Sequence, residues 1–222
     1  MKKLMFICNL TLIVILGVSK INPLQAQLPK DNKQQLVKSK IIKAHYSSFP
    51  VTRVKADNII KGDYSGFISK SGKLSIQEKN DIMDLAARIN AYENIWINNP
   101  TEPISLDIAD KVMDTSEDFI SFDEDMESGN EGHTSTKGYA SWRAIWPTVF
   151  KNNFGELLKL EVYDVTIYLN GNMATTVFKD KTQYIKDKKK GDAFNSGYMC
   201  SFLWHKVKGE WRILVEHGSK LK

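Results

Sequence analysis

The chain has 222 residues, 26% of them charged, and a formal net charge of +5 at pH 7. Three of those charges come from Lys2, Lys3 and Lys20, and residues 1–26 contain no acidic residue, so the rest of the chain carries +2. So small a charge argues against nucleic-acid binding, and the length suits one domain of ordinary size.

Residues 1–26 have the layout of a secretory signal peptide. A basic start is followed by an almost wholly apolar run over residues 4–18 and by the small residue Ala26 at a plausible cleavage point. The apolar run is short for a membrane span, although an uncleaved N-terminal anchor is the alternative. We therefore predict a secreted or periplasmic protein with no membrane contact after cleavage. Only Cys200 would then remain, so no intrachain disulfide is expected.

Residues 27–74 are predicted to be a poorly ordered lead-in. They are rich in Lys, Ser, Asn and Gln, with scattered apolar residues and weak periodicity. A short helix is expected around residues 34–44. The folded domain is predicted to span residues 75–222.

A first amphipathic helix is predicted from Ser75 to about Asn98. Ser75 and Glu78 form a capping box, in which each side chain binds a backbone amide of the first helical turn. Apolar residues then recur at helical spacing, at Ile82, Leu85, Ala86, Ile89, Tyr92 and Trp96.

Two further helices are predicted before the sheet, over residues 103–113 and 135–150. Between them, Phe119–Phe122 reads as a short strand, and residues 123–134 read as a polar loop.

The rest of the chain reads as antiparallel sheet. Strands over residues 160–169 and 173–184 flank Asn170-Gly171, a pair typical of a tight hairpin turn. A loop over residues 186–197 leads to a strand over residues 198–207 and then to a final strand. Helices followed by antiparallel strands indicate an α+β fold.

The last hairpin is predicted to turn at Lys208-Gly209. Alternation along an unbroken strand then places His217 on the face that holds Trp211 and Ile213, and Glu216 on the opposite face.

The order of these segments resembles a known superfamily. The relevant stretches are "DFISFDED", "TKGYASWRAIWPTVF", "VYDVTIYLNGNMATTVFKDKTQYI" and "YMCSFLWHKVKGEWRILVEHGSK". Together they resemble the nuclear-transport-factor-2-like superfamily, in particular its SnoaL-like and ketosteroid-isomerase-like branches. The last stretch is also similar to the association domain of calcium/calmodulin-dependent kinase II. The resemblance covers residues 75–222.

The resemblance implies a curved antiparallel β-sheet packed on three N-terminal helices, forming a cone with an internal pocket. Such domains usually dimerise through the sheet, so a homodimer is expected. No particular reaction is implied, because domains of this superfamily serve as isomerases, cyclases, ligand binders and assembly modules.

Two residues are candidate catalytic groups. His217, at the end of the last strand, would lie at the mouth of the pocket, and an imidazole titrates near neutral pH. Asp123 would lie on the pocket rim as a general base. The alternatives are a buried or interfacial histidine and a solvated acidic loop.

A set of mostly aromatic residues is predicted to line the pocket and bind the ligand. They lie on the first and third predicted helices and on the last two strands: Tyr92, Glu93, Trp96, Tyr139, Trp142, Trp146, Trp204 and Trp211. The alternative is that these rings fill the core.

No metal site or cofactor is predicted, because the four histidines are dispersed and no nucleotide-binding or phosphate-binding motif is present. We predict an exported pocket protein that binds a small, partly apolar organic ligand; isomerase- or cyclase-type proton transfer is a chemistry that such a pocket would allow, and the sequence does not decide whether the protein is an enzyme. The alternative is a non-catalytic, homodimeric assembly or interaction module.

Overall fold

The computed structural model describes residues 40–59, 62–68, 72–97, 106–124, 133–145, 156–187 and 192–221. All of them belong to one compact unit, Lys38–Lys222. The predicted secretory signal lies outside the described residues, as do residues 34–39 of the predicted first short helix. Among the described helices, none has the length and apolar character that crossing a membrane requires.

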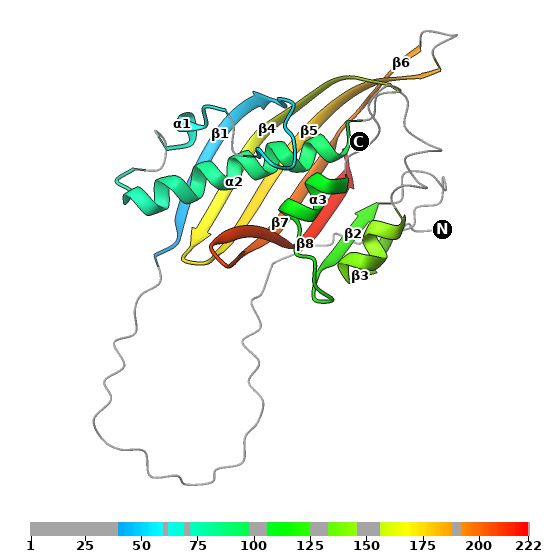
Figure 1. The fold of residues 1–222 in the computed structure, drawn as a ribbon. Helices are drawn as coiled ribbons and strands as arrows, with labels where there is room; N and C mark the ends of the chain where they lie inside the picture. The colour runs from blue at the N-terminus through cyan, green and yellow to red at the C-terminus, as the bar shows by residue number, and fades with distance from the viewer. Residues whose placement is uncertain are drawn as a thin grey trace, which may run out of the picture. The chain divides into compact units, whose positions relative to one another are not determined.

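An eight-stranded sheet forms the body of this unit (Figure 1). The neighbouring strands follow the order β1-β4-β5-β7-β8-β2-β3, and β6 also pairs with β5. The strands are β1 (Ile42–Pro50), β2 (Ile120–Glu124), β3 (His133–Lys137), β4 (Glu156–Asn170), β5 (Met173–Asp187), β6 (Asp192–Ser196), β7 (Tyr198–Val207) and β8 (Glu210–Lys220).

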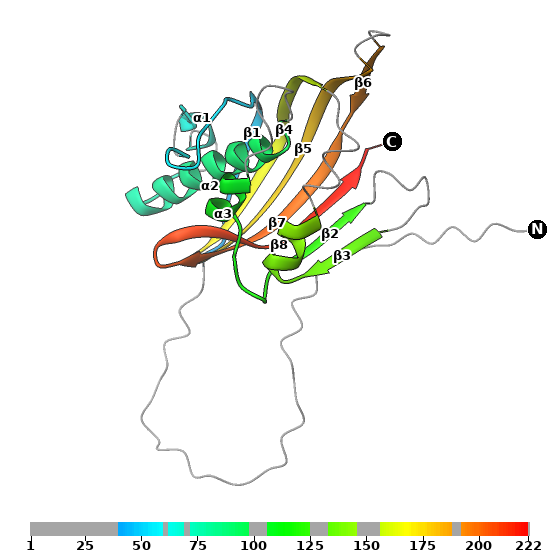
Figure 2. The same cartoon turned by 45° about the vertical axis from the view of Figure 1, so that its right-hand side comes forward.

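The helices cover one face of this curved sheet, which we call the inner face (Figures 1 and 2). The labelled helices are α1 (Ser65–Ile68), α2 (Ile76–Ile95) and α3 (Leu106–Val112), and residues 139–145 are also helical. The α+β fold with a curved sheet is therefore confirmed. The sheet is mixed, however, because β2 runs parallel to β8 while the other neighbouring strands pair antiparallel.

Helix α2 begins at the predicted capping box. The Ser75 hydroxyl accepts a hydrogen bond from the Glu78 amide, and the Glu78 carboxylate accepts one from the Ser75 amide. From this start the helix presents Ile82, Leu85 and Ile89 to the core, each 0% exposed. Its hydrophobic stripe is thus the one that the sequence predicts.

The predicted lead-in is wrong for the described part of residues 27–74. Ile42–Pro50 form β1, an edge strand paired with β4, so the domain begins well before Ser75. Two buried asparagines of α2 then fix the chain that follows. Asn90 accepts a hydrogen bond from the Thr52 amide at 2.8 Å, and Asn94 accepts one from the Val54 amide at 3.1 Å. These contacts hold an otherwise polar segment against the core.

Three other boundaries differ from the prediction. Ser135–Lys137 belong to β3, and the helix that follows occupies residues 139–145, with residues 146–150 outside the described range. The predicted loop over residues 123–134 contains the end of β2 and the start of β3. The predicted loop over residues 186–197 contains β6, which pairs with β5. Of these short strands, β2 pairs with the distant β8, whereas β3 and β6 pair with the strand just before them in the chain.

Both predicted hairpins are present. β4 and β5 meet at Gly171-Asn172, one residue later than predicted, and Gly171 has φ +59°. β7 and β8 meet at Lys208-Gly209, whose φ values are +54° and +88°. Two adjacent positive φ values are what a type I′ turn requires.

A β-bulge in the last hairpin reverses the predicted facing of β8. Trp204 pairs with Ile213, but Leu203 pairs with Val215, so one residue of β8 is left between the two pairs. Beyond this bulge Glu216 lies opposite Phe202, and both are buried on the inner face. His217 lies opposite Ser201, on the other side of the sheet, which we call the outer face. The prediction that His217 shares a face with Trp211 and Ile213 is therefore wrong.

Candidate functional site

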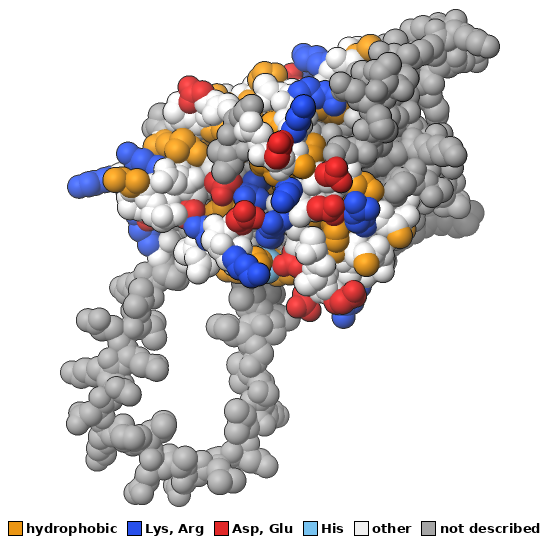
Figure 3. All heavy atoms as spheres, viewed as in Figure 1, with side chains coloured by type: hydrophobic (Ala, Val, Ile, Leu, Met, Phe, Trp, Pro, Cys, Tyr) orange, Lys and Arg blue, Asp and Glu red, His pale blue; other side chains and the backbone are white. Residues whose placement is uncertain are grey.

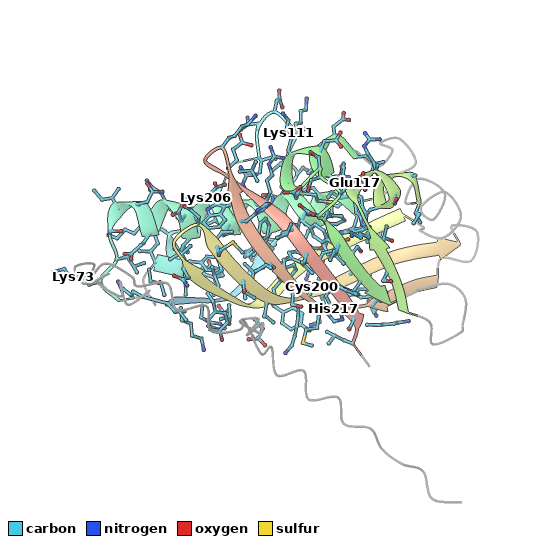
Figure 4. All side chains as sticks on the ribbon, turned by 90° about the horizontal axis from the view of Figure 1, so that it is seen from below. Lys73, Lys111, Glu117, Cys200, Lys206 and His217 are labelled. Carbon is cyan, nitrogen blue, oxygen red and sulfur yellow. The ribbon has the colours of Figure 1, made fainter. Side chains whose placement is uncertain are left out.

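Helix α2 carries ionisable groups near both of its ends, and the two ends differ in character. Near the N-terminal end, Asp81 accepts hydrogen bonds from Lys206 at 2.5 Å and from the Trp211 indole at 3.3 Å. The negative charge of Asp81 is thus compensated inside the fold by the Lys206 ammonium group. Near the C-terminal end, Glu93 lies about 18 Å further along the helix axis, at 1.5 Å per residue. In Figure 4, Lys206 lies toward the opposite end of β7 from Cys200.

Three buried polar side chains meet around Glu93. They are Glu93 of α2, Asp180 of β5 and Cys200 of β7, whose potential ligand atoms all lie within 4.8 Å of one another. Their exposed fractions are only 2%, 5% and 5%. We call this group the acid cluster.

Strand alternation explains why Asp180 points inward. In β5 the side chains of Ala174, Thr176 and Phe178 face the core at every second position, and Asp180 is the next in this series. Its carboxylate accepts hydrogen bonds from the Tyr198 amide at 3.1 Å and from the Cys200 thiol at 3.8 Å. The backbone and the thiol therefore hold this carboxyl in place.

The two acids are the most perturbed carboxyl groups of the site. Burial raises the pKa of Asp180 to about 7, although hydrogen bonds from Tyr198 and Cys200 act in the opposite direction. Burial, and then the nearby charge of Asp180, raise the pKa of Glu93 well above its ordinary value. Two such close carboxyls in a poorly solvated site favour a state in which they retain a proton between them.

Glu93 also has an unused acceptor. Its Oε1 atom is buried and has no hydrogen-bond partner among the described residues. An unsatisfied buried carboxyl oxygen costs about 1–3 kcal/mol, so a ligand donor at this position would recover part of that free energy.

Aromatic rings lie next to the acid cluster on α2, β5 and β7. Tyr92 packs against Phe202 with ring centroids 4.5 Å apart, and Phe202 packs against Phe178 at 5.1 Å. Trp96 continues this wall from α2, at 5.4 Å from Tyr92 and 6.4 Å from Trp142. The polar cluster thus lies at the base of an apolar, mostly aromatic wall.

Tyr139 extends the wall but its hydroxyl is already engaged. Its ring stacks on Trp142 at 5.7 Å, while its hydroxyl donates a hydrogen bond to Asp110 at 2.5 Å. Arg143 also binds Asp110, with Nε and Nη2 at 3.0 and 3.2 Å from its two carboxylate oxygens. Burial, and then the Asp110 carboxylate, raise the pKa of Tyr139. This phenol therefore serves the fold and is a poor acid.

The predicted ligand-binding residues divide into two groups. Glu93 belongs to the acid cluster and Tyr92 is its neighbour in α2, while Trp96, Trp142 and Tyr139 follow in a chain of ring contacts that leads away from them. Trp204 and Trp211 are 0% exposed, and their indole N–H groups donate to Thr176 and Asp81, so they fill the core. Trp146 lies outside the described residues.

The predicted catalytic residues are separated from the cluster or lie beyond description. His217 lies on the outer face with its Nε2 atom 3.0 Å from the Ser219 hydroxyl. The backbone of Asp123 belongs to β2 opposite Gly218, and its side chain is outside the described set.

Sequence reasoning missed Asp180 and misread the facing of Glu216. A signal for Asp180 was present, because it continues the inward alternation of β5 after Phe178. The inward orientation of Glu216 could not be predicted, because no sequence pattern in β8 indicates the bulge that causes it.

The side chains of the acid cluster are also of the kinds that bind a metal ion. A thiol and two carboxyls form a donor set that suits a small divalent transition metal, such as zinc with an open fourth position. Each donor would first have to lose its proton, which the raised carboxyl pKa values oppose.

In Figure 3 the exposed surface over the helices carries charges of both signs, whereas the acid cluster holds two acids and no basic side chain. Lys and Arg side chains alternate with Asp and Glu side chains across this view, without a large region of one sign (Figure 3). A mixed surface of this kind gives no indication of a polyanionic partner.

Comparison with family models gives no match, and comparison with curated proteins gives none either. Solved structures do match. A nuclear transport factor 2-like superfamily protein from Salmonella enterica is 16% identical, with a TM-score of 0.47 over 67% of this chain and 94% of that one. A ketosteroid isomerase-like protein from Erwinia carotovora is 15% identical, with a TM-score of 0.47 over 64% and 97%.

A third similar structure is a nuclear transport factor 2-like protein from Pseudomonas putida, 15% identical, with a TM-score of 0.48 over 66% of this chain and 89% of that one. At these identities no residue role is transferred from one protein to another. These solved structures, to which the chain is similar, carry the names of the superfamily that the sequence resembles.

Proposed function

We propose that this protein binds a small, partly apolar organic ligand against the inner face of its sheet, at the acid cluster. The observation that carries the proposal is a pair of buried carboxyls, Glu93 and Asp180, at the base of an aromatic wall. Aromatic rings bind an apolar ligand body, and a few fixed polar groups set its orientation. In this proposal the protein acts after export, in the periplasm or outside the cell.

Isomerase- or cyclase-type proton transfer is the chemistry that the acid pair would add. A carboxyl that retains its proton can donate it to a ligand oxygen, and its ionised neighbour can accept a proton from a ligand carbon. This role moves from the predicted His217 to Glu93 and Asp180, because the bulge in β8 turns the imidazole to the outer face.

Ligand screening by thermal shift on the chain from residue 27 onward tests the proposal. We expect at least one small organic compound to raise the melting temperature, because a ligand that binds only the folded state stabilises it. Glu93→Gln and Asp180→Asn should each weaken that ligand about tenfold or more, as expected for lost charged hydrogen bonds. Asp164→Asn is the matched control, since Asp164 is an exposed acid paired with Lys179.

The same compounds, incubated with the protein in deuterated water, test the chemistry. Deuterium exchanged into a ligand C–H position by the unaltered chain, and lost with Asp180→Asn, supports proton transfer. A library from which no compound raises the melting temperature would contradict the proposed function. A ligand that binds without exchange would limit that function to binding.

A second function, that of a non-catalytic homodimeric module, is favoured by the outer face. Large apolar side chains stand exposed there: Phe122 is 44% exposed on β2 and Met199 is 41% exposed on β7. The predicted dimerisation through the sheet would cover them.

Sedimentation at micromolar concentration tests this second function. We expect a dimer, and we expect Phe122→Glu to give a monomer because it places a charge in the apolar contact. Ile76→Glu is the control, since Ile76 is 79% exposed on α2, away from the outer face. A monomeric unaltered chain would rule out the module.

A further inference from the structure

We propose that the ligand of the acid cluster is an organic cation that carries a primary ammonium group next to an apolar body. The inference rests on the proposed function, because it names the class of molecule that the same site binds. Three independent features of the site favour a cation: the charge that the fold leaves uncompensated, the unused acceptor of Glu93, and the aromatic wall.

The charge of the acid pair has no counter-ion in the described structure. Two other acids of α2 are paired: the buried Asp81 with Lys206, and the half-buried Asp84 with Arg88. Glu93 and Asp180 make no ion pair with a Lys, Arg or His side chain within the described ranges. The pair retains a proton, so it carries one negative charge once the other carboxyl is ionised, and a cationic ligand compensates that charge.

The unused acceptor selects a cation that donates hydrogen bonds. Asp180 already accepts from the Tyr198 amide and the Cys200 thiol, whereas Oε1 of Glu93 accepts from no described residue. A primary ammonium has three N–H donors on one compact charge, and it can reach both carboxyls at once. A quaternary ammonium has no N–H donor and would leave the Glu93 oxygen unsatisfied.

The aromatic wall suits both parts of such a ligand. The negative faces of Tyr92 and Trp96 attract a cation that approaches within about 6 Å, and the same rings pack against an apolar body. A bare metal ion would make no use of these rings. The Cys200 thiol donates a hydrogen bond to Asp180 at 3.8 Å, so its sulfur already has a partner within the acid cluster.

Three probes that share one ring and differ in their polar end test the inference. They are 2-phenylethylammonium, 2-phenylethanol and phenylacetate, titrated by calorimetry into the chain from residue 27 onward at pH 8. We expect the ammonium to bind about tenfold or more tightly than the alcohol, as a charge-assisted hydrogen bond does relative to a neutral one. We expect the carboxylate not to bind, because its charge repels the acid pair.

Isosteric variants locate the binding. Glu93→Gln and Asp180→Asn keep the side-chain shape and should remove the preference for the ammonium over the alcohol. Asp164→Asn should keep it. Circular dichroism of each variant verifies folding, and a folded Glu93→Gln that retains full ammonium preference would overturn the inference.

The remaining outcomes separate this inference from the proposed function. Equal binding of the alcohol and the ammonium would overturn the cation inference and leave the proposed small-ligand site standing. If one zinc ion binds per chain and prevents 2-phenylethylammonium from binding, the acid cluster is a metal site. That result would also overturn the inference. If no probe binds and the library screen gives no ligand, both proposals fail.

Discussion

Replacing Trp204 with alanine is expected to lower the free energy of unfolding by about 3–5 kcal/mol, the range measured for large-to-alanine changes in protein cores. The Trp204 side chain is 0% exposed, and its ring packs 5.9 Å from that of Phe202. Its indole N–H donates to the Thr176 hydroxyl at 2.9 Å. The variant therefore leaves a cavity and also an unused buried hydroxyl.

Urea denaturation of the chain from residue 27 onward measures this change. Thr176→Val separates the two contributions, because it removes the acceptor and leaves the ring, at an expected cost of about 1–3 kcal/mol. Tyr168→Ala is a surface control on β4, expected to cost less than about 1 kcal/mol because Tyr168 is 38% exposed. A loss for Trp204→Ala as small as that of the surface control would show that Trp204 lines an open site and does not fill the core.

Asparagine at position 180 is expected to make the protein more stable at pH 8 and to flatten its pH dependence. The pKa of Asp180 is about 7 in the fold, mainly because of burial, and about 3.8 in the unfolded chain. Between these values the folded state binds a proton that the unfolded chain has released. The free energy of unfolding therefore falls as the pH rises from about 4 to 7, by on the order of 3 kcal/mol.

The raised pKa of Glu93 has the same sign and extends the loss above pH 7. Acids whose pKa is lowered, such as Asp110, act in the opposite direction, but only below about pH 4. Burial also raises the pKa of Asp84, so the contribution of Asp180 is the difference between Asp180→Asn and the unaltered chain in denaturation at pH 5 and pH 8, with Asp164→Asn as the control that keeps the slope. Equal slopes for Asp180→Asn and the unaltered chain would refute the account of the pair.

Much of the fold is predictable from local patterns. The capping box at Ser75 and the turn at Lys208-Gly209 are each set by a few neighbouring residues, and both stand where the sequence predicts. β1 is different. Its apolar and polar residues alternate imperfectly, and they become a strand only because β4, more than a hundred residues away, offers a partner.

The candidate site is predictable only in part, for two physical reasons. Glu93 was identified because helical periodicity reports burial on α2, but Asp180 and Cys200 come from strands that pair far along the chain. The bulge between Leu203 and Trp204 adds one residue to β8 and reverses every side chain after it. A two-residue period without that bulge assigns His217 to the inner face and Glu216 to the outer one.

The tryptophans show where composition misleads. Indole rings were expected around a ligand, yet Trp204 and Trp211 are fully buried and use their N–H groups inside the fold. A tryptophan packs in a core as well as in a ligand site when its indole N–H can reach a hydrogen-bond acceptor. The sequence does not show whether such an acceptor is near.

Carboxyl ¹³C NMR of the chain from residue 27 onward tests the acid pair most directly, with Asp180→Asn and Glu93→Gln used to assign the two signals. We expect the Asp180 carboxyl to titrate near pH 7, the Glu93 carboxyl to titrate higher than an ordinary glutamate, and both to shift when 2-phenylethylammonium is added. Two carboxyls that titrate near pH 4, as solvated acids do, and that do not respond to the amine would contradict a buried, ligand-binding pair.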